Sequence, residues 1–65
     1  MRIQDCKFNN CLLSMDKENF PYDDKTEDMY LVFINDDLLL GTYDKEKAFE
    51  TYSMASRALN LNDKG

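Results

Sequence analysis

Two short apolar runs separated by a turn sequence constrain the fold of this 65-residue chain more than any other feature. Residues 30–34 read YLVFI and residues 38–43 read LLLGTY. Between them stand Asn35, Asp36 and Asp37, which are typical turn formers. The pattern predicts a β-hairpin over residues 29–43. Both of its strands are apolar on both faces, so a single covering layer cannot bury them all.

The faces of this hairpin depend on the length of its loop. A two-residue loop and a three-residue loop group the side chains differently, but both leave two apolar faces. Two interpretations follow: the second face is hidden by the rest of the chain, or it meets a partner. With a three-residue loop at 35–37, one face holds Tyr30, Val32, Ile34, Leu38 and Leu40, and the other holds Leu31, Phe33, Leu39 and Tyr43.

An amphipathic helix is predicted over residues 45–60. Asp44 is placed to accept amide protons of the first turn, and Glu46 interacts favourably with the helix dipole. Apolar and small side chains then recur at three- and four-residue spacing, which predicts one core-facing stripe. The stripe contains Ala48, Phe49, Tyr52, Ala55, Ser56 and Leu59, widened by Met54, Ala58 and Leu61.

Another hairpin is predicted over residues 2–15, with its turn at the two asparagines 9–10. A two-residue loop there pairs Cys6 with Leu13. In that register Cys6 and Cys11 are diagonal neighbours roughly 7–8 Å apart, beyond comfortable disulfide reach. We therefore expect two free, buried thiols.

The segment between the hairpins, residues 16–28, is acidic and holds the only proline. It predicts a long exposed loop. Carboxylates on a small rigid scaffold can imitate phosphates and accelerate association with a basic cleft. The predicted partner-binding residues are Asp16, Glu18, Asp23, Asp24, Glu27 and Asp28, together with Asp36 and Asp37 of the second hairpin's turn.

These elements predict an α+β fold: two β-hairpins form a small antiparallel sheet, and one C-terminal α-helix packs across one face. The chain is expected to be one small domain, residues 1–65. Its parts are a hairpin over 2–15, an acidic loop over 16–28, a hairpin over 29–43 and a helix over 45–60.

Composition excludes several function classes. Thirteen acidic and eight basic side chains give a net charge of −5, which argues against direct binding to nucleic acid. No apolar run approaches the roughly 18 residues that a membrane span requires. The first residues lack the basic and then apolar pattern of a secretory signal, which predicts a cytoplasmic protein.

The sequence also offers little for catalysis, for a cofactor or for a metal ion. It contains no histidine and two glycines, so neither an imidazole base nor a glycine-rich phosphate loop can be built. Two cysteines alone leave a zinc shell half empty. A calcium loop starting at Asp16 fails because Phe20 and Pro21 occupy its fifth and sixth positions. We expect a protein that is not an enzyme and holds no cofactor or metal.

In composition the chain resembles the small acidic proteins that bacteriophages and other mobile elements encode against host defence, including anti-CRISPR and anti-restriction proteins. It is short, lacks tryptophan and histidine, and is rich in Asp, Asn, Lys and Tyr. The resemblance implies inhibition by stoichiometric binding to a host protein, often at a surface that normally receives nucleic acid. The alternatives are a homodimeric accessory protein and a small structural subunit of a larger assembly.

Overall fold

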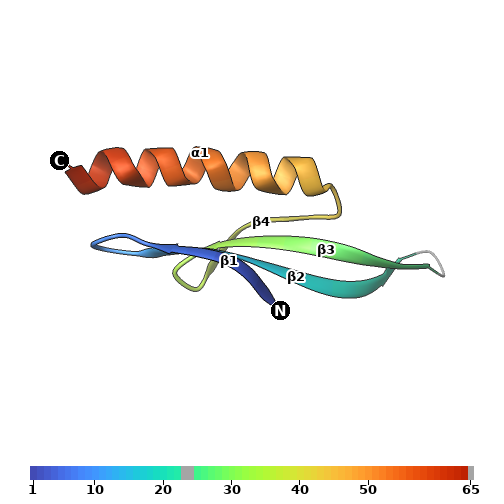
Figure 1. Cartoon of the computed structure of the whole chain (residues 1–65). Coiled ribbons are helices and arrows are strands. Elements are labelled where there is room, and N and C mark those ends of the chain that lie inside the picture. The colour runs from blue at the N-terminus through green and yellow to red at the C-terminus, as the bar shows by residue number, and fades with distance from the viewer. Residues whose placement is uncertain (23–24, 65) are drawn as a thin grey trace.

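The fold was obtained as a computed structural model, which describes the backbone of residues 1–22 and 25–64 and the side chains of residues 1–19 and 27–61. Its strands form one antiparallel sheet in the order β1-β2-β3-β4, and α1 packs across one face (Figure 1). The predicted α+β architecture is confirmed. The elements are β1 (Arg2–Lys7), β2 (Leu12–Tyr22), β3 (Lys25–Ile34), β4 (Asp37–Thr42) and α1 (Lys45–Lys64).

The first hairpin has the predicted register. Cys6 pairs with Leu13, and the amide of Phe8 donates a 2.8 Å hydrogen bond to the carbonyl of Cys11 across the turn. Both cysteines are free, as expected, but they are half-buried rather than buried. This hairpin lies within the sheet and does not fold over it. In the described part of the chain, no element covers the sheet face opposite α1 (Figure 1).

The prediction of a loop over residues 16–28 is wrong. β2 and β3 pair without interruption from Leu13 with Ile34 to Tyr22 with Lys25. Charged residues, asparagine and proline have low strand propensity, but propensity measures mainly how a side chain packs in its sheet context. Here a backbone partner on the neighbouring strand overrides it. A cross-strand hydrogen bond of 3.2 Å from Asn19 Nδ2 to Asp28 Oδ1 adds to the pairing.

The second hairpin turns over two residues, not three. Ile34 pairs directly with Asp37, and Asn35 takes a φ of 56°, a left-handed conformation that asparagine tolerates. The Asn35 side chain also holds the neighbouring turn, because its Oδ1 accepts a 3.1 Å hydrogen bond from the amide of Leu12. The amide of Asn35 in turn donates to the Leu12 carbonyl at 2.7 Å.

A bulge in β4 makes the faces of this hairpin differ from the predicted ones. Val32 pairs with Leu40 and Phe33 pairs with Leu38, so Leu39 is an extra residue without a partner on β3. Leu38 therefore shares the face of Phe33, opposite α1. Leu39 joins Leu40 on the side of the helix. Leu38 and Leu39 have therefore exchanged the faces that were predicted for them.

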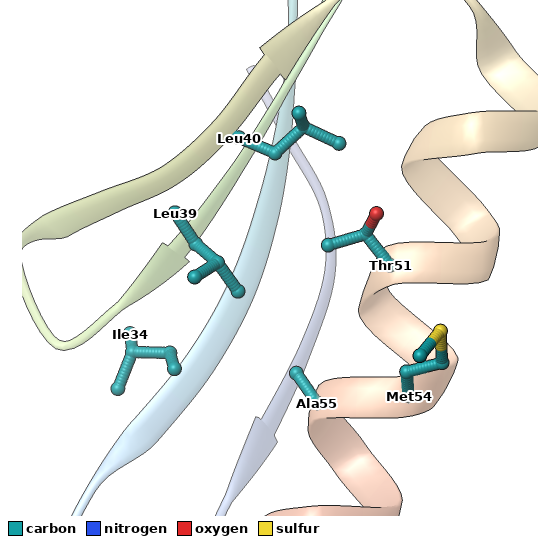
Figure 2. Close-up of a pocket in the computed structure, with 6 residues that line it drawn as sticks. All are labelled: Ile34, Leu39, Leu40, Thr51, Met54 and Ala55. Atoms are coloured by element: carbon teal, nitrogen blue, oxygen red, sulfur yellow. The ribbon is translucent and has the colours of Figure 1, made fainter.

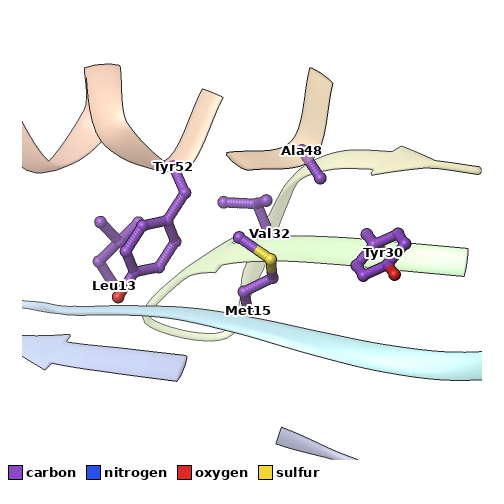
Figure 3. Packing of buried hydrophobic residues seen from close by; sticks show 6 residues of the cluster. All are labelled: Leu13, Met15, Tyr30, Val32, Ala48 and Tyr52. Carbon is purple, nitrogen blue, oxygen red and sulfur yellow. The ribbon is translucent and has the colours of Figure 1, made fainter. Parts of the chain in front are cut away.

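The helix begins where the sequence predicted. The Asp44 Oδ1 atom accepts a 3.3 Å hydrogen bond from the amide of Lys47, and the amide of Asp44 donates to Thr42 Oγ1 at 3.0 Å. Glu46 lies in the first turn. The helix ends at Lys64, four residues beyond the predicted end. It covers a compact apolar cluster (Figure 3), whose buried members are Leu13, Met15, Tyr30, Val32, Ala48 and Tyr52.

The buried stripe of α1 is narrower than predicted. Met54 and Leu61 are 61% and 71% exposed, and Ala58 is also exposed, so these three residues do not widen the stripe. Phe49 is 38% exposed and contacts the ring of Tyr30 edge to face, with centroids 6.3 Å apart. The reason is geometric, because a helix lying on a sheet buries little more than about 100° of its circumference.

Candidate partner-binding site

Residues 18–22 and 25–29 form a two-stranded ribbon that extends beyond the rest of the sheet, and we call the segment 18–29 the arm. β1 pairs with β2 as far as Asp16, and β4 pairs with β3 as far as Tyr30. Within the described residues the arm therefore has no neighbouring strand on either side. It projects past the beginning of α1 (Figure 1) and contributes to a long axis of 48 Å, against 18 and 16 Å for the other two. The remaining residues form the body.

Most of the chain's net charge belongs to the arm. Residues 18–29 contain five acidic side chains and one basic side chain, a net charge of −4 out of the −5 of the whole chain. The other 53 residues contain eight acidic and seven basic side chains, so the body is close to neutral.

Two predicted partner-binding residues at the base of the arm already have partners within the chain. Asp16 accepts a hydrogen bond from Arg2 Nε at 3.1 Å. Glu18 is paired with the ammonium group of Met1. Arg2 and Met1 belong to the edge of the body, so these pairs join the base of the arm to β1.

Further along the arm, Glu27 and Asp28 present charge on opposite faces. Asp28 pairs with Asn19, whereas Glu27 pairs with Phe20 at the next ladder position, and successive residues of a strand point to opposite sides. Asp28 is shared between Asn19 and Lys17, whose Nζ lies 4.0 Å from Asp28 Oδ2. Glu27 is exposed, and its carboxylate has no ion-pair partner in the described part of the chain. The arm is thus acidic on both sides.

Four predicted partner-binding residues remain, Asp23, Asp24, Asp36 and Asp37. Asp23 and Asp24 lie outside the described residues. Asp36 and Asp37 are exposed, but they lie at the opposite end of β3. Asp36 is nine positions from Glu27, which corresponds to about 30 Å along a strand that rises roughly 3.3 Å per residue. Of the described predicted residues, those in 16–28 are brought together, whereas the hairpin turn forms a separate acidic group.

An apolar groove between β4 and α1 is the feature that the sequence interpretation missed. Its volume is about 450 Å³. Figure 2 shows side chains from the β3–β4 hairpin facing side chains from the helix. The three consecutive leucines at 38–40 were a signal for it, but Met54 had been assigned to the buried stripe. The lining residues are Ile34, Leu39, Leu40, Thr51, Met54 and Ala55.

Two buried polar side chains of the body, Ser14 and Tyr52, do not line this groove. Burial raises the pKa of Tyr52, and the nearby Cys6 and Asp5 raise it further. The hydroxyl groups of Tyr52 and Ser14 are buried, and neither finds a hydrogen-bond partner among the described residues. Over the same residues, no three side chains of the cysteine, aspartate and glutamate type gather closely enough to hold a metal ion.

No described helix combines the length and the apolar character needed to cross a membrane. Comparison of the chain with protein-family models, with curated proteins and with solved structures gave no match. The interpretation of the site therefore depends on its own geometry and charge.

Proposed function

We propose that this chain is a non-enzymatic protein that inserts its acidic arm into a basic cleft of a partner protein and blocks that cleft by stoichiometric binding. The observation that carries the proposal is the concentration of the net charge, −4 of −5, in residues 18–29, of which 18–22 and 25–29 form the projecting ribbon. The partner is a cytoplasmic host protein whose basic surface normally receives nucleic acid. This is the mode of action implied by the resemblance to anti-defence proteins of phages and other mobile elements.

The shape of the arm supports this mode of binding. Neighbouring strands lie about 5 Å apart, so a two-stranded ribbon is narrow enough to enter a cleft between two walls. Glu27 and Asp28 lie on opposite faces of the ribbon, which allows both walls to be contacted. A basic cleft with low-dielectric walls concentrates its electrostatic field, and that field attracts an acidic ribbon as it attracts a phosphate backbone.

The pairs at the base of the arm support the same interpretation. Asp16 and Glu18 are engaged by Arg2 and Met1, and these contacts hold the ribbon against the body. A preorganised binding element loses less conformational entropy on association than a mobile loop. In this proposal Asp16 and Glu18 position the arm, and the acidic residues 23, 24, 27 and 28 contact the partner.

The test compares two variants that lose the same charge at different places. The arm variant carries Asp23→Asn, Asp24→Asn, Glu27→Gln and Asp28→Asn. The matched body variant carries Asp36→Asn, Asp37→Asn, Glu46→Gln and Glu50→Gln, four positions that are exposed. A partner that the parent protein retains from host lysate at low salt is purified, and its affinity for all three proteins is measured by calorimetry over a salt series.

We expect the affinity of the parent to fall with added salt, because salt shortens the range of exposed charge interactions. Exposed ion pairs contribute roughly 0.2–1 kcal/mol each, so the arm variant should bind about fourfold more weakly or worse, with a flatter salt dependence. The body variant should bind like the parent, and the parent should displace nucleic acid from the partner. Equal losses in both variants, or affinity independent of salt, would contradict the proposal.

The alternative function, a homodimeric accessory protein or a structural subunit, is favoured by a different observation. The apolar groove between β4 and α1 exposes hydrophobic side chains on the body, away from the acidic arm. Such a surface suits association between protein copies better than it suits a basic cleft.

A further inference from the structure

We propose that β4 and the apolar groove beside it form a two-fold interface between two copies of this chain. The interface belongs to the body and does not depend on the proposed role of the arm. It differs from the surface expected from the sequence, which was a whole face of the second hairpin.

The exposed apolar side chains gather around the groove. Leu39 and Met54, which line it, are 48% and 61% exposed, and they come from β4 and from the helix that runs beside it (Figures 1 and 2). Leu38, which is 58% exposed, lies on the same edge strand but on the opposite face of the sheet. The bulge at Leu39 places Leu39 and Leu40 together on the helix side. The small side chains of Thr51 and Ala55 face them from α1 and leave the space between the two elements open (Figure 2).

The uncovered face of the sheet is less suited to association. Leu31 and Phe33 on that face are half-buried, and Ser14 is fully buried although none of the described elements covers it. The side chains of this face therefore pack against one another and shield its centre. Leu39 at the β4 edge and Met54 on the adjacent helix are both exposed, so their burial by a partner would gain more than burial of Leu31 or Phe33.

The two edges of the sheet differ in how well they are protected against pairing. β1 carries the charged residues Arg2, Asp5 and Lys7, and every β1 residue except Cys6 is exposed. β4 reads DLLLGT, without a lysine, an arginine or a proline. Charged side chains, prolines and bulges are the usual means of preventing edge pairing. Both edge strands contain a bulge, but β4 has one charged residue, Asp37 at its beginning, so it is the less protected edge. Its bulge bends the strand but leaves 40–42 in regular pairing with β3.

A second copy fits this surface because the surface is self-complementary. It contains both protruding apolar side chains, such as Met54, and a groove able to receive them. Chains this short often gain stability from a disulfide, a metal ion or association. Both cysteines are free, and the described residues contain no metal-binding cluster. Association is the remaining means, and it needs about 500 Å² from each copy, roughly a tenth of the 4814 Å² surface.

A two-fold axis perpendicular to the sheet defines the assembly. It pairs β4 with β4 in antiparallel orientation and makes one continuous sheet of eight strands, with both helices on the same face. The axis lies near Leu39 and Leu40, the centre of the strand. Asp37 of one copy then lies opposite Thr42 of the other, so the two Asp37 carboxylates stay apart. The two acidic arms point in opposite directions and remain free.

The test is sedimentation of the parent and of single-lysine variants over a concentration series. Leu39→Lys and Met54→Lys each place a charge in the interface, whereas Ile3→Lys makes the same change on the β1 edge, where Ile3 is 38% exposed. We expect a reversible dimer in the parent and in Ile3→Lys. In each of the other two variants, the dissociation constant should rise by at least about tenfold. Circular dichroism establishes that each variant is folded.

A cysteine variant gives a second, independent result. In a background carrying Cys6→Ala and Cys11→Ala, Leu39→Cys should form a disulfide-linked dimer on mild oxidation, because residues near a two-fold axis face their own copies. Ile3→Cys should not. A parent that is monomeric at every concentration would overturn the proposal. So would a dimer unaffected by Met54→Lys, a substitution at an exposed helix position that tolerates lysine.

Discussion

The arm and the body are built from the same two strands, yet they differ in almost every physical property. In the body, β2 and β3 are flanked by β1 and β4 and covered by α1, and their side chains at Leu13, Met15 and Val32 are fully buried. In the arm, the same strands have only each other, and the described side chains are polar or half-buried. One pair of strands thus supplies both the centre of the core and an exposed acidic projection.

Strand pairing and core formation are therefore separate requirements. The two strands of the arm pair through the ladder from Glu18 with Met29 to Tyr22 with Lys25, and none of the arm's described side chains is fully buried. An isolated two-stranded ribbon is only marginally stable in water. The arm therefore depends for its stability on the body, where the ladder continues, and on Arg2, which pairs with Asp16 at the base of the arm.

The largest effect is expected when a methionine is replaced by alanine in the body and, for comparison, in the arm. Met15→Ala removes a fully buried side chain from the core and should lower the free energy of unfolding by about 2–5 kcal/mol. This is comparable with the whole stability of roughly 3–5 kcal/mol expected for so small a core. Met29→Ala removes a half-buried side chain from the arm and should cost less than about 1 kcal/mol. Urea denaturation of both variants measures the contrast. Equal losses would show that the arm belongs to the core.

A smaller loss of stability is expected when one polar contact is removed from each region. Asp44→Ala removes the carboxylate that caps the first turn of α1, and loss of an N-cap costs about 1 kcal/mol. Asn19→Ala removes the exposed hydrogen bond to Asp28 in the arm and should cost no more than about 0.5 kcal/mol. Thermal melts of the two variants should show a lower Tm for Asp44→Ala. The reverse order would mean that the arm contributes more to stability than the start of the helix.

The smallest effect concerns a buried hydroxyl in the body. Tyr52→Phe removes a hydroxyl without a partner among the described residues, and we expect a gain of up to about 1 kcal/mol at neutral pH. Because burial raises the pKa of Tyr52 above its ordinary value of 10.0, the folded state keeps this proton when the unfolded state begins to lose it. The free energy of unfolding of the parent should therefore fall as pH rises above about 10.

The Tyr52→Phe variant lacks this titrating group, so its stability should fall less steeply with pH over the same range. Chemical denaturation at a series of pH values measures both slopes. Identical slopes in the parent and in Tyr52→Phe would show that the hydroxyl reaches water. The contrast between a buried core in the body and exposed side chains in the arm would then be weaker.

Local patterns in the sequence were sufficient for several features. The pairing of Cys6 with Leu13, the helix start after Asp44 and the burial of Ala48 and Tyr52 were all predicted. Each depends on residues close together in the chain, where turn chemistry, capping and periodicity act directly. The pairing of β2 with β3 along residues 16–22 and 25–28 was missed, because the low strand propensity of these residues led to the prediction of a loop.

Only the tertiary structure decided how these pieces are exposed. The order β1-β2-β3-β4 makes β2 and β3 central and leaves β4 as an edge, and that order depends on the pairing of β2 with β3, which joins the two predicted hairpins up to Leu13 with Ile34. The bulge at Leu39 then decides which faces Leu38 and Leu39 take, and the narrow contact of α1 leaves Met54 exposed. The sequence by itself determined which segments are apolar or acidic. Long-range packing decided which of them are exposed, because burial depends on neighbours that are far apart in the chain.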